Sequence, residues 1–131
     1  MRRPSPGMAG PVLVIIDDEM EFTKALDHFF SQRGYEVHVA LRGGSGLQLV
    51  TQHRPDVVLT DLKMPGMDGE EVLQGIRRDS PQTKVIVMTA YDDGVTRERV
   101  LALGAFAHFE KPLCSIATLA QTIKSALGAT G

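Results

Sequence analysis

Three short runs of apolar, mostly β-branched residues constrain the fold of this chain more than any other feature. They are Val12 to Ile16, Val57 to Leu59 and Val85 to Met88. None of them alternates between apolar and polar residues, so each predicts a strand that is buried on both faces, as in a parallel sheet. A sheet of this kind needs helices on both of its faces.

Helical patterns fill the intervals between these runs. Phe22 begins an apolar stripe of helical spacing that continues to Phe30. Gly34 can end this helix, because glycine readily adopts the left-handed conformation of a C-cap. Asp68 can cap a later helix, and Glu71 can complete its capping box. The third apolar run belongs to a predicted strand at 84–89, and the remaining predicted elements are strands at 35–40 and 107–110 and helices at 46–52, 96–103 and 116–127. Five strands alternating with five helices predict a doubly wound α/β domain with a five-stranded parallel sheet.

The length of 131 residues suits a single domain, which we expect to span residues 10–128. Prolines and glycines before Pro11 predict a flexible N-terminal tail at 1–9, and residues 129–131 are expected to form a short C-terminal tail. Whether the domain stands alone or forms part of a longer protein is left open by the sequence.

Charge and cysteine content narrow the function classes. The chain has 14 Lys and Arg against 16 Asp and Glu, and no basic block, so direct binding to nucleic acid is not expected. The single Cys114 cannot form an internal disulfide, which fits a reducing compartment. No run has the length of a secretory signal or a membrane span. We therefore expect a cytoplasmic protein that does not bind membranes.

Polar residues follow the predicted strands at the edge where ligands bind in doubly wound sheets. These residues are Asp17, Asp18, Asp61, Thr89 and Lys111. Neighbouring carboxylates repel unless a cation is present, and Mg²⁺ prefers oxygen ligands. With Mg²⁺ on one phosphoryl oxygen, the hydroxyl and the ammonium can hold the other two, and Asp61 can attack phosphorus to give an acyl phosphate.

Four motifs in this order resemble the receiver domain of two-component response regulators, a CheY-like fold. They are Asp17-Asp18-Glu19, the stretch from Asp61 to Gly69, Val87-Met88-Thr89-Ala90, and Gly104-Ala105 followed by Lys111-Pro112. The resemblance covers about residues 11–128.

The resemblance implies a role for each site residue. Asp61 would be the phosphoacceptor, and Asp18, Asp61 and the backbone carbonyl of Lys63 would bind Mg²⁺, with Asp17 acting mainly through a water. Thr89 and Lys111 would contact the phosphoryl group, and the Lys111-Pro112 peptide would be cis.

His108 departs from the usual pattern. The family normally carries Tyr or Phe three residues before the lysine, as an aromatic that turns inward when the threonine moves toward the phosphate. His108 is smaller than these residues, and an imidazole can form hydrogen bonds. Thr89 and His108 are therefore the predicted switch residues.

The implied function is that of a phosphoacceptor switch, not of an enzyme beyond its own phosphorylation and dephosphorylation. The expected partners are a histidine kinase or a histidine phosphotransfer protein, and an output domain or protein that contacts the helix 96–103 and the last helix. A dimer that forms on phosphorylation is also compatible with the family. The alternative is a Mg²⁺-dependent aspartyl-phosphate phosphatase of the haloacid dehalogenase type. Such enzymes carry a second Asp two residues after the nucleophile, where this chain has Lys63.

The other histidines show no pattern of a metal site. No pair among His28, His38 and His53 has a spacing suited to zinc. The sequence therefore assigns them no chemistry.

Overall fold

The structure, a computed structural model, describes residues 10–90, 94–111 and 116–128. The predicted tails and the Lys111-Pro112 peptide bond fall outside these ranges. The strands are β1 (Val12–Ile16), β2 (Glu36–Ala40), β3 (Val57–Asp61), β4 (Lys84–Thr89) and β5 (Ala107–Glu110). The helices are α1 (Met20–Ser31), α2 (Gly43–His53), α3 (Gly69–Asp79), α4 (Gly94–Ala102) and α5 (Ile116–Gly128). The predicted α/β fold with five strands and five helices is confirmed.

The five strands form one parallel sheet in the order β2-β1-β3-β4-β5. The chain moves from β1 to one edge and then returns to the other side of β1, so the strand order reverses between β1 and β3. The register pairs Ile16 with Thr60 across these two strands. Asp17 and Asp61, the next residues, therefore stand side by side at the carboxyl ends of β1 and β3.

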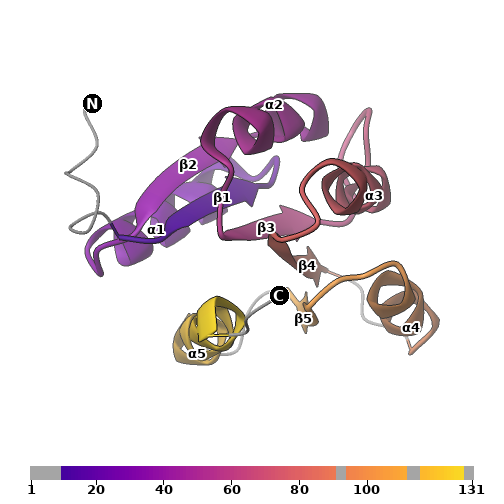
Figure 1. Ribbon diagram of the computed structural model, residues 1–131. Helices are drawn as coiled ribbons and strands as arrows, with labels where there is room; N and C mark the ends of the chain where they lie inside the picture. The colour runs from indigo at the N-terminus through magenta and orange to yellow at the C-terminus, as the bar shows by residue number, and fades with distance from the viewer. Residues whose placement is uncertain (1–9, 91–93, 112–115, 129–131) are drawn as a thin grey trace.

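Helices cover both faces of the sheet (Figure 1). Side chains of one parity along the strands, such as Val14 and Ile16, pack in a core with α2, α3 and α4. Side chains of the other parity, such as Leu13 and Ile15, pack with α1 and α5. Both faces are thus buried, which explains the continuous apolar runs in the sequence. Within the described ranges, no helix is long and apolar enough to cross a bilayer.

Two helices begin earlier than their sequence pattern predicts. α2 begins at Gly43 rather than at Gly46, and α4 begins at Gly94 rather than at Thr96. A Cβ on Gly43 would lie 2.9 Å from the carbonyl oxygen of Met67, and one on Gly46 would lie 2.4 Å from Cδ1 of Ile16. The glycines therefore allow α2 to pack closely, although glycine is a poor helix former and hides the start of a helix in the sequence.

Candidate functional site

Main-chain hydrogen bonds fix the strand ends that carry the predicted site residues. The N–H of Asp17 donates to the carbonyl of Ala40 over 3.1 Å, which holds the start of the loop after β1. The N–H of Lys111 donates to the carbonyl of Thr89 over 2.6 Å. The loops after β1 and β5 therefore leave the sheet from fixed positions, and the side chains there share one edge.

Lys111 lies at the centre of the site. Its Nζ donates to Oδ2 of Asp17 over 2.8 Å, also donates to Oε1 of Glu19, and lies 3.5 Å from Oδ2 of Asp61. The same ammonium is 4.6 Å from the centre of the Phe22 ring. Lys111 is 7% exposed, Asp61 6% and Asp17 0%, so these three charged groups are shielded from water, whereas the side chain of Glu19 is 62% exposed.

Three carboxylates gather around this lysine. Asp17, Glu19 and Asp61 each offer an oxygen, and these atoms lie within 4.8 Å of one another. If all of them are ionised, one ammonium faces three negative charges. Oxygen donors of this charge and spacing suit a hard divalent cation such as Mg²⁺, which prefers carboxylate oxygens and water.

The pKa values at the site follow from burial and from mutual repulsion. Burial raises the pKa of Asp17 above its usual value, against the lowering effect of its hydrogen bond with Lys111. Burial and the charge of Asp17 likewise raise the pKa of Asp61. Burial alone would lower the pKa of Lys111, but the carboxylates outweigh it and raise that pKa. The lysine therefore stays charged, while the two aspartates lack full compensation for their charges.

The predicted metal ligands separate into two groups. Asp17 and Asp61 meet, whereas Asp18 is exposed and lies outside the group of three carboxylates. Lys63 donates its N–H to Oδ1 of Asp61 over 3.4 Å. Glu19 was not among the predicted ligands, although it belongs to the same acidic triplet in the sequence. Its contact with Lys111 depends on the turn after β1, where the N–H of Glu19 donates to Oδ1 of Asp17 over 2.9 Å.

Thr89 and His108 lie on one face of the sheet. Thr89 ends β4 and is 1% exposed, and His108 in β5 is 9% exposed. The register pairs Val87 with His108 and Thr89 with Glu110. Since alternate residues of a strand share a face, Thr89, Val87 and His108 all point to the side covered by α3 and α4. The two predicted switch residues therefore lie in adjacent strands, on the same face, and two residues out of register.

The loop after Asp61 is held close by a glycine and a helix cap. The N–H of Gly69 donates to the carbonyl of Leu62 over 2.8 Å, and a Cβ on Gly69 would lie 2.3 Å from the carbonyl oxygen of Asp61. The predicted capping box is present, because Oδ1 of Asp68 accepts from the N–H of Glu71 and Oε1 of Glu71 accepts from the N–H of Asp68. The start of α3 is thereby fixed against the end of β3, where Asp61 lies.

A shallow groove of about 360 Å³ leads from this loop to α4. Leu62, Lys63 and Met64 form one side of it, and α3 and α4 contribute residues to the other. Glu70 of α3 and Arg99 of α4 form a bidentate ion pair in this groove, with N–O distances of 2.6 and 2.9 Å. The groove therefore lies between the loop that follows Asp61 and the helices α3 and α4.

The sequence and the fold are similar to proteins of one family. The family model of the response regulator receiver domain matches residues 13–124. Sporulation initiation phosphotransferase F of Bacillus subtilis (strain 168) is 38% identical over 105 residues, which cover 80% of this chain and 85% of the relative. Regulatory protein AtoC of Escherichia coli (strain K12) is 40% identical over 100 residues, which cover 76% of this chain and 22% of that protein.

Solved structures of receiver domain proteins are similar to this chain as well. A response regulator receiver domain protein from Clostridium thermocellum superimposes with a TM-score of 0.85 at 29% identity, covering 91% of this chain and 95% of the other. Chemotaxis protein CheY4 of Vibrio cholerae superimposes with a TM-score of 0.84 at 27% identity, covering 91% of this chain and 100% of the other. Because the family model matches residues 13–124, most of the sequence, and the fold superimposes on solved receiver domains, this chain belongs to the response regulator receiver domain family.

Proposed function

We propose that Asp61 accepts a phosphoryl group from a histidine kinase or a histidine phosphotransfer protein. The observation that carries this proposal is the buried carboxylate of Asp61, 3.5 Å from the ammonium of Lys111 and beside Asp17 at the strand ends. A carboxylate in this position has a cation beside it to compensate negative charge, and the loop that follows it lines a groove.

The transfer is a substitution at phosphorus. A carboxylate oxygen of Asp61 forms the new P–O bond, and the P–N bond of the phosphohistidine breaks, with its electron pair passing to the imidazole, which then takes up a proton. The product is an acyl phosphate. Asp61 must be ionised to attack. Burial raises the pKa of Asp61, and the charge of Lys111 opposes this rise.

Mg²⁺ is the cofactor that fits this set of oxygen donors. When bound, it supplies positive charge to the carboxylates and to the phosphoryl oxygens. Asp17 and Asp61 are the buried candidates for holding it, and Asp18 and the backbone carbonyl of Lys63 are the further proposed ligands. Thr89 and Lys111 are proposed to hold the remaining phosphoryl oxygens, by a hydroxyl and an ammonium respectively.

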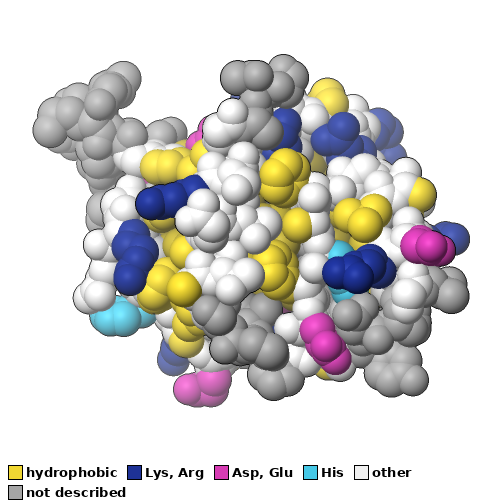
Figure 2. Space-filling view, turned by 90° about the horizontal axis from the view of Figure 1, so that it is seen from below, with side chains coloured by type: hydrophobic (Ala, Val, Ile, Leu, Met, Phe, Trp, Pro, Cys, Tyr) yellow, Lys and Arg dark blue, Asp and Glu magenta, His cyan; other side chains and the backbone are white. Residues whose placement is uncertain are grey.

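The proposed output is a shift in the packing of α4 and β5. Movement of Thr89 toward the phosphoryl group would open space on the face that it shares with His108, so that the imidazole and α4 repack. The surface formed by α4, β5 and α5 is the proposed contact for an output domain or protein, or for a second copy of the chain. Figure 2 shows hydrophobic side chains in the middle of this face and Lys and Arg side chains on both sides. Leu101 is 43% exposed and Phe106 37% exposed.

Phosphorylation of the purified protein by acetyl phosphate and Mg²⁺, followed by intact mass, tests the acceptor. The parent and Asp79→Asn, a control at an exposed aspartate, should gain one phosphoryl group that hydroxylamine removes. Asp61→Asn should gain none, and EDTA should abolish the gain in all variants. A mass gain that persists in Asp61→Asn would refute the assignment. Many turnovers of a small phosphate ester would instead favour the phosphatase.

The metal ligands can be separated by titrating Mn²⁺ into single variants and following the free ion by electron paramagnetic resonance. Asp17→Asn and Asp61→Asn should weaken binding most, because both residues are buried. Asp18→Asn tests the exposed carboxylate, and Glu19→Gln tests the residue that the sequence did not indicate. Equal affinities in Asp17→Asn and the parent would remove Asp17 from the proposed ligand set.

A further inference from the structure

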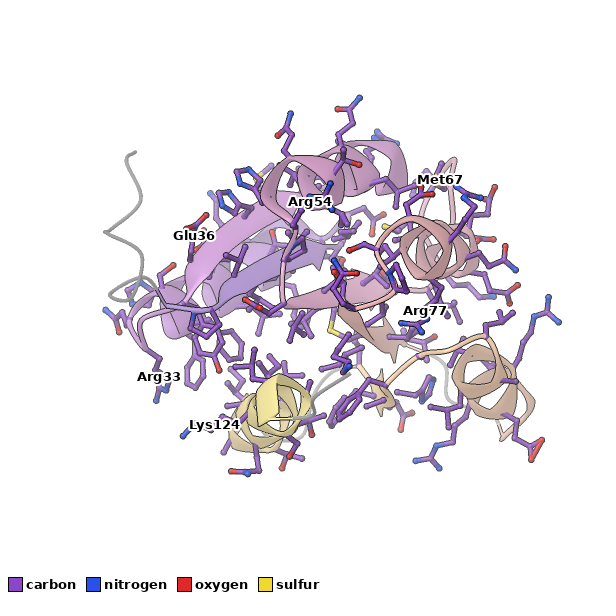
Figure 3. All side chains as sticks on the ribbon, in the orientation of Figure 1. Arg33, Glu36, Arg54, Met67, Arg77 and Lys124 are labelled. Atoms are coloured by element: carbon purple, nitrogen blue, oxygen red, sulfur yellow. The ribbon has the colours of Figure 1, made fainter. Side chains whose placement is uncertain are left out.

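A second cluster of metal-binding side chains lies away from the phosphoacceptor. Glu36 and His38 are alternate residues of β2 and therefore point to the same face of the sheet, the face covered by α2. His53 is the last residue of α2. The fold thus brings together two histidines that are separated by fifteen positions in the sequence, together with a glutamate, and Figure 3 shows Glu36 on β2 beside α2.

The three side chains are close enough to share one ion. Nε2 of His38 is 2.7 Å from Oε2 of Glu36, and Nδ1 of His53 is 4.0 Å from the same oxygen. One donor atom from each residue lies within 4.8 Å of those of the other two. Ligands bound to one zinc ion at about 2.0–2.2 Å lie roughly 3.4 Å apart in a tetrahedral site, so rotation of partly exposed side chains suffices to close the set.

The two histidine rings are stacked, with centroids 3.7 Å apart and planes that differ by 15°. The lone pairs of imidazole nitrogens lie in the plane of the ring, so one ring must turn out of the stack before both can bind the same ion. The stacking shows that β2 and α2 hold the two imidazoles in direct contact.

The site is sheltered but accessible. The side chains of Glu36, His38 and His53 are 17%, 27% and 28% exposed. An ion can therefore reach them from solvent and keep water on its remaining positions, while the hydrophobic residues of β2 and α2 limit their movement.

We propose that Glu36, His38 and His53 form a binding site for a transition-metal dication of the Zn²⁺ class. Two imidazole nitrogens and one carboxylate oxygen suit Zn²⁺, Cu²⁺ or Ni²⁺, whereas Mg²⁺ prefers oxygen ligands only. The ion would connect the edge strand β2 to the end of α2.

This site is separate from the acidic one. Glu36 pairs with Val12 at the start of β1, whereas Asp17 follows the end of that strand. His38 pairs with Val14, so three to five residues at about 3.3 Å each put the two sites on the order of 10–16 Å apart along the sheet. Zinc binding at the histidines therefore does not require any residue of the acceptor site.

Isothermal titration of Zn²⁺ into the full chain, with excess Mg²⁺ present to occupy the acidic site, tests the proposal. The parent should bind one Zn²⁺ per chain, and His38→Gln and His53→Gln should each weaken binding by at least about tenfold, since loss of a ligand should cost no less than loss of a residue that supports one. His28→Gln removes an exposed histidine from α1 and should bind as the parent does. Circular dichroism and phosphorylation by acetyl phosphate confirm that each variant is folded.

Two further measurements separate this site from other zinc ligands. Cys114→Ser should leave the affinity unchanged, and Co²⁺ used as a spectroscopic probe should give visible bands without a thiolate charge-transfer band. Loss of Zn²⁺ binding in Cys114→Ser, unchanged binding in His53→Gln, or no saturable binding in the parent would each overturn the proposal.

Discussion

Lys111 does not fully balance the negative charges of the two buried aspartates, Asp17 and Asp61. The ammonium contacts Asp17 directly but lies 3.5 Å from Asp61, and burial raises the pKa of both aspartates. A folded protein normally avoids unbalanced buried charge because it costs several kcal/mol. We infer that the unbalanced charge at this site lowers the unfolding free energy of the metal-free protein. The same charge favours binding of a divalent cation, which in turn favours binding of a phosphoryl group.

Asp61→Asn should therefore stabilise the protein when Mg²⁺ is absent. The raised pKa means that the folded state holds a proton above the pH at which the unfolded chain releases it, near 3.8. The unfolding free energy of the parent thus falls as the pH rises from about 4 through the folded-state pKa. In EDTA at pH 7 we expect a gain on the order of 1 kcal/mol for the variant, and a smaller gain near pH 4.

Urea unfolding between pH 4 and pH 7.5 measures this difference. Asp79→Asn, at an exposed position, should follow the parent at every pH. A variant less stable than the parent at pH 7 would show that the interaction of Asp61 with Lys111 outweighs the cost of burial.

At the scale of elements, the junction between β3 and α3 fixes the position of the carboxylate of Asp61. Gly69 is the first residue of α3, and its missing side chain lets the helix start against the end of β3. Gly69→Ala would force a Cβ to within 2.3 Å of the carbonyl oxygen of Asp61. We expect a loss of about 1–3 kcal/mol in unfolding free energy and slower phosphorylation, because the loop after Asp61 must move.

Gly44→Ala is the matched control for this change. Gly44 lies in α2 and its added Cβ meets nothing within 4 Å, so alanine should stabilise the helix by up to about 1 kcal/mol and leave phosphorylation unchanged. Similar losses in both variants would mean that Gly69 has no special role at the junction.

The strands and most of the acidic site could be predicted from the sequence, and both for the same physical reason. Strands buried on both faces must be continuously apolar, and the residues that follow them in a parallel sheet must meet at one edge. Asp17, Asp61 and Lys111 could therefore be brought together without coordinates. The contact of Glu19 with Lys111 depends on the turn after β1, and the cluster of Glu36, His38 and His53 depends on how α2 packs on β2. Neither follows from spacing along the chain.

The helix α4 is held more weakly than its neighbours. Among its described side chains only Val100 is buried, and its pair with Glu70 on α3 runs through Arg99 at the surface. Exposed ion pairs contribute little to global stability, but this one ties α4 to α3. Arg99→Gln should therefore speed amide exchange in α4 while the urea midpoint changes little.

Hydrogen exchange by mass spectrometry measures this effect, with Arg78→Gln as the control. Arg78 pairs with Asp79 inside α3, and within the described parts of the chain it forms no ion pair with another element, so its loss should leave α4 unchanged. Equal exchange in α4 for the parent and Arg99→Gln would show that packing around Val100 alone holds the helix.

At the scale of the whole molecule, one sheet separates two sites with different donor sets. The carboxylates lie where β1 and β3 end, and the imidazoles lie on the edge strand β2 beside α2. The sheet between them is a close-packed core with apolar residues on both faces. If both proposed sites bind ions, hard and borderline cations would be separated by ligand type at different places on one rigid element.

Stabilisation by Mg²⁺ and by Zn²⁺ should consequently be additive. Each ion binds the folded state, so it raises the unfolding free energy by RT ln(1 + [ion]/Kd), or about 2.7 kcal/mol at a hundred times Kd. Sites more than about 10 Å apart with no shared residue should combine within roughly 0.5 kcal/mol. Urea unfolding with neither ion, with each ion and with both measures the sum, and His53→Gln should lose only the zinc contribution. A combined gain well below the sum would mean that both ions compete for the carboxylates at the strand ends, and a gain above it would mean that α2 transmits binding from β2 to the acceptor site.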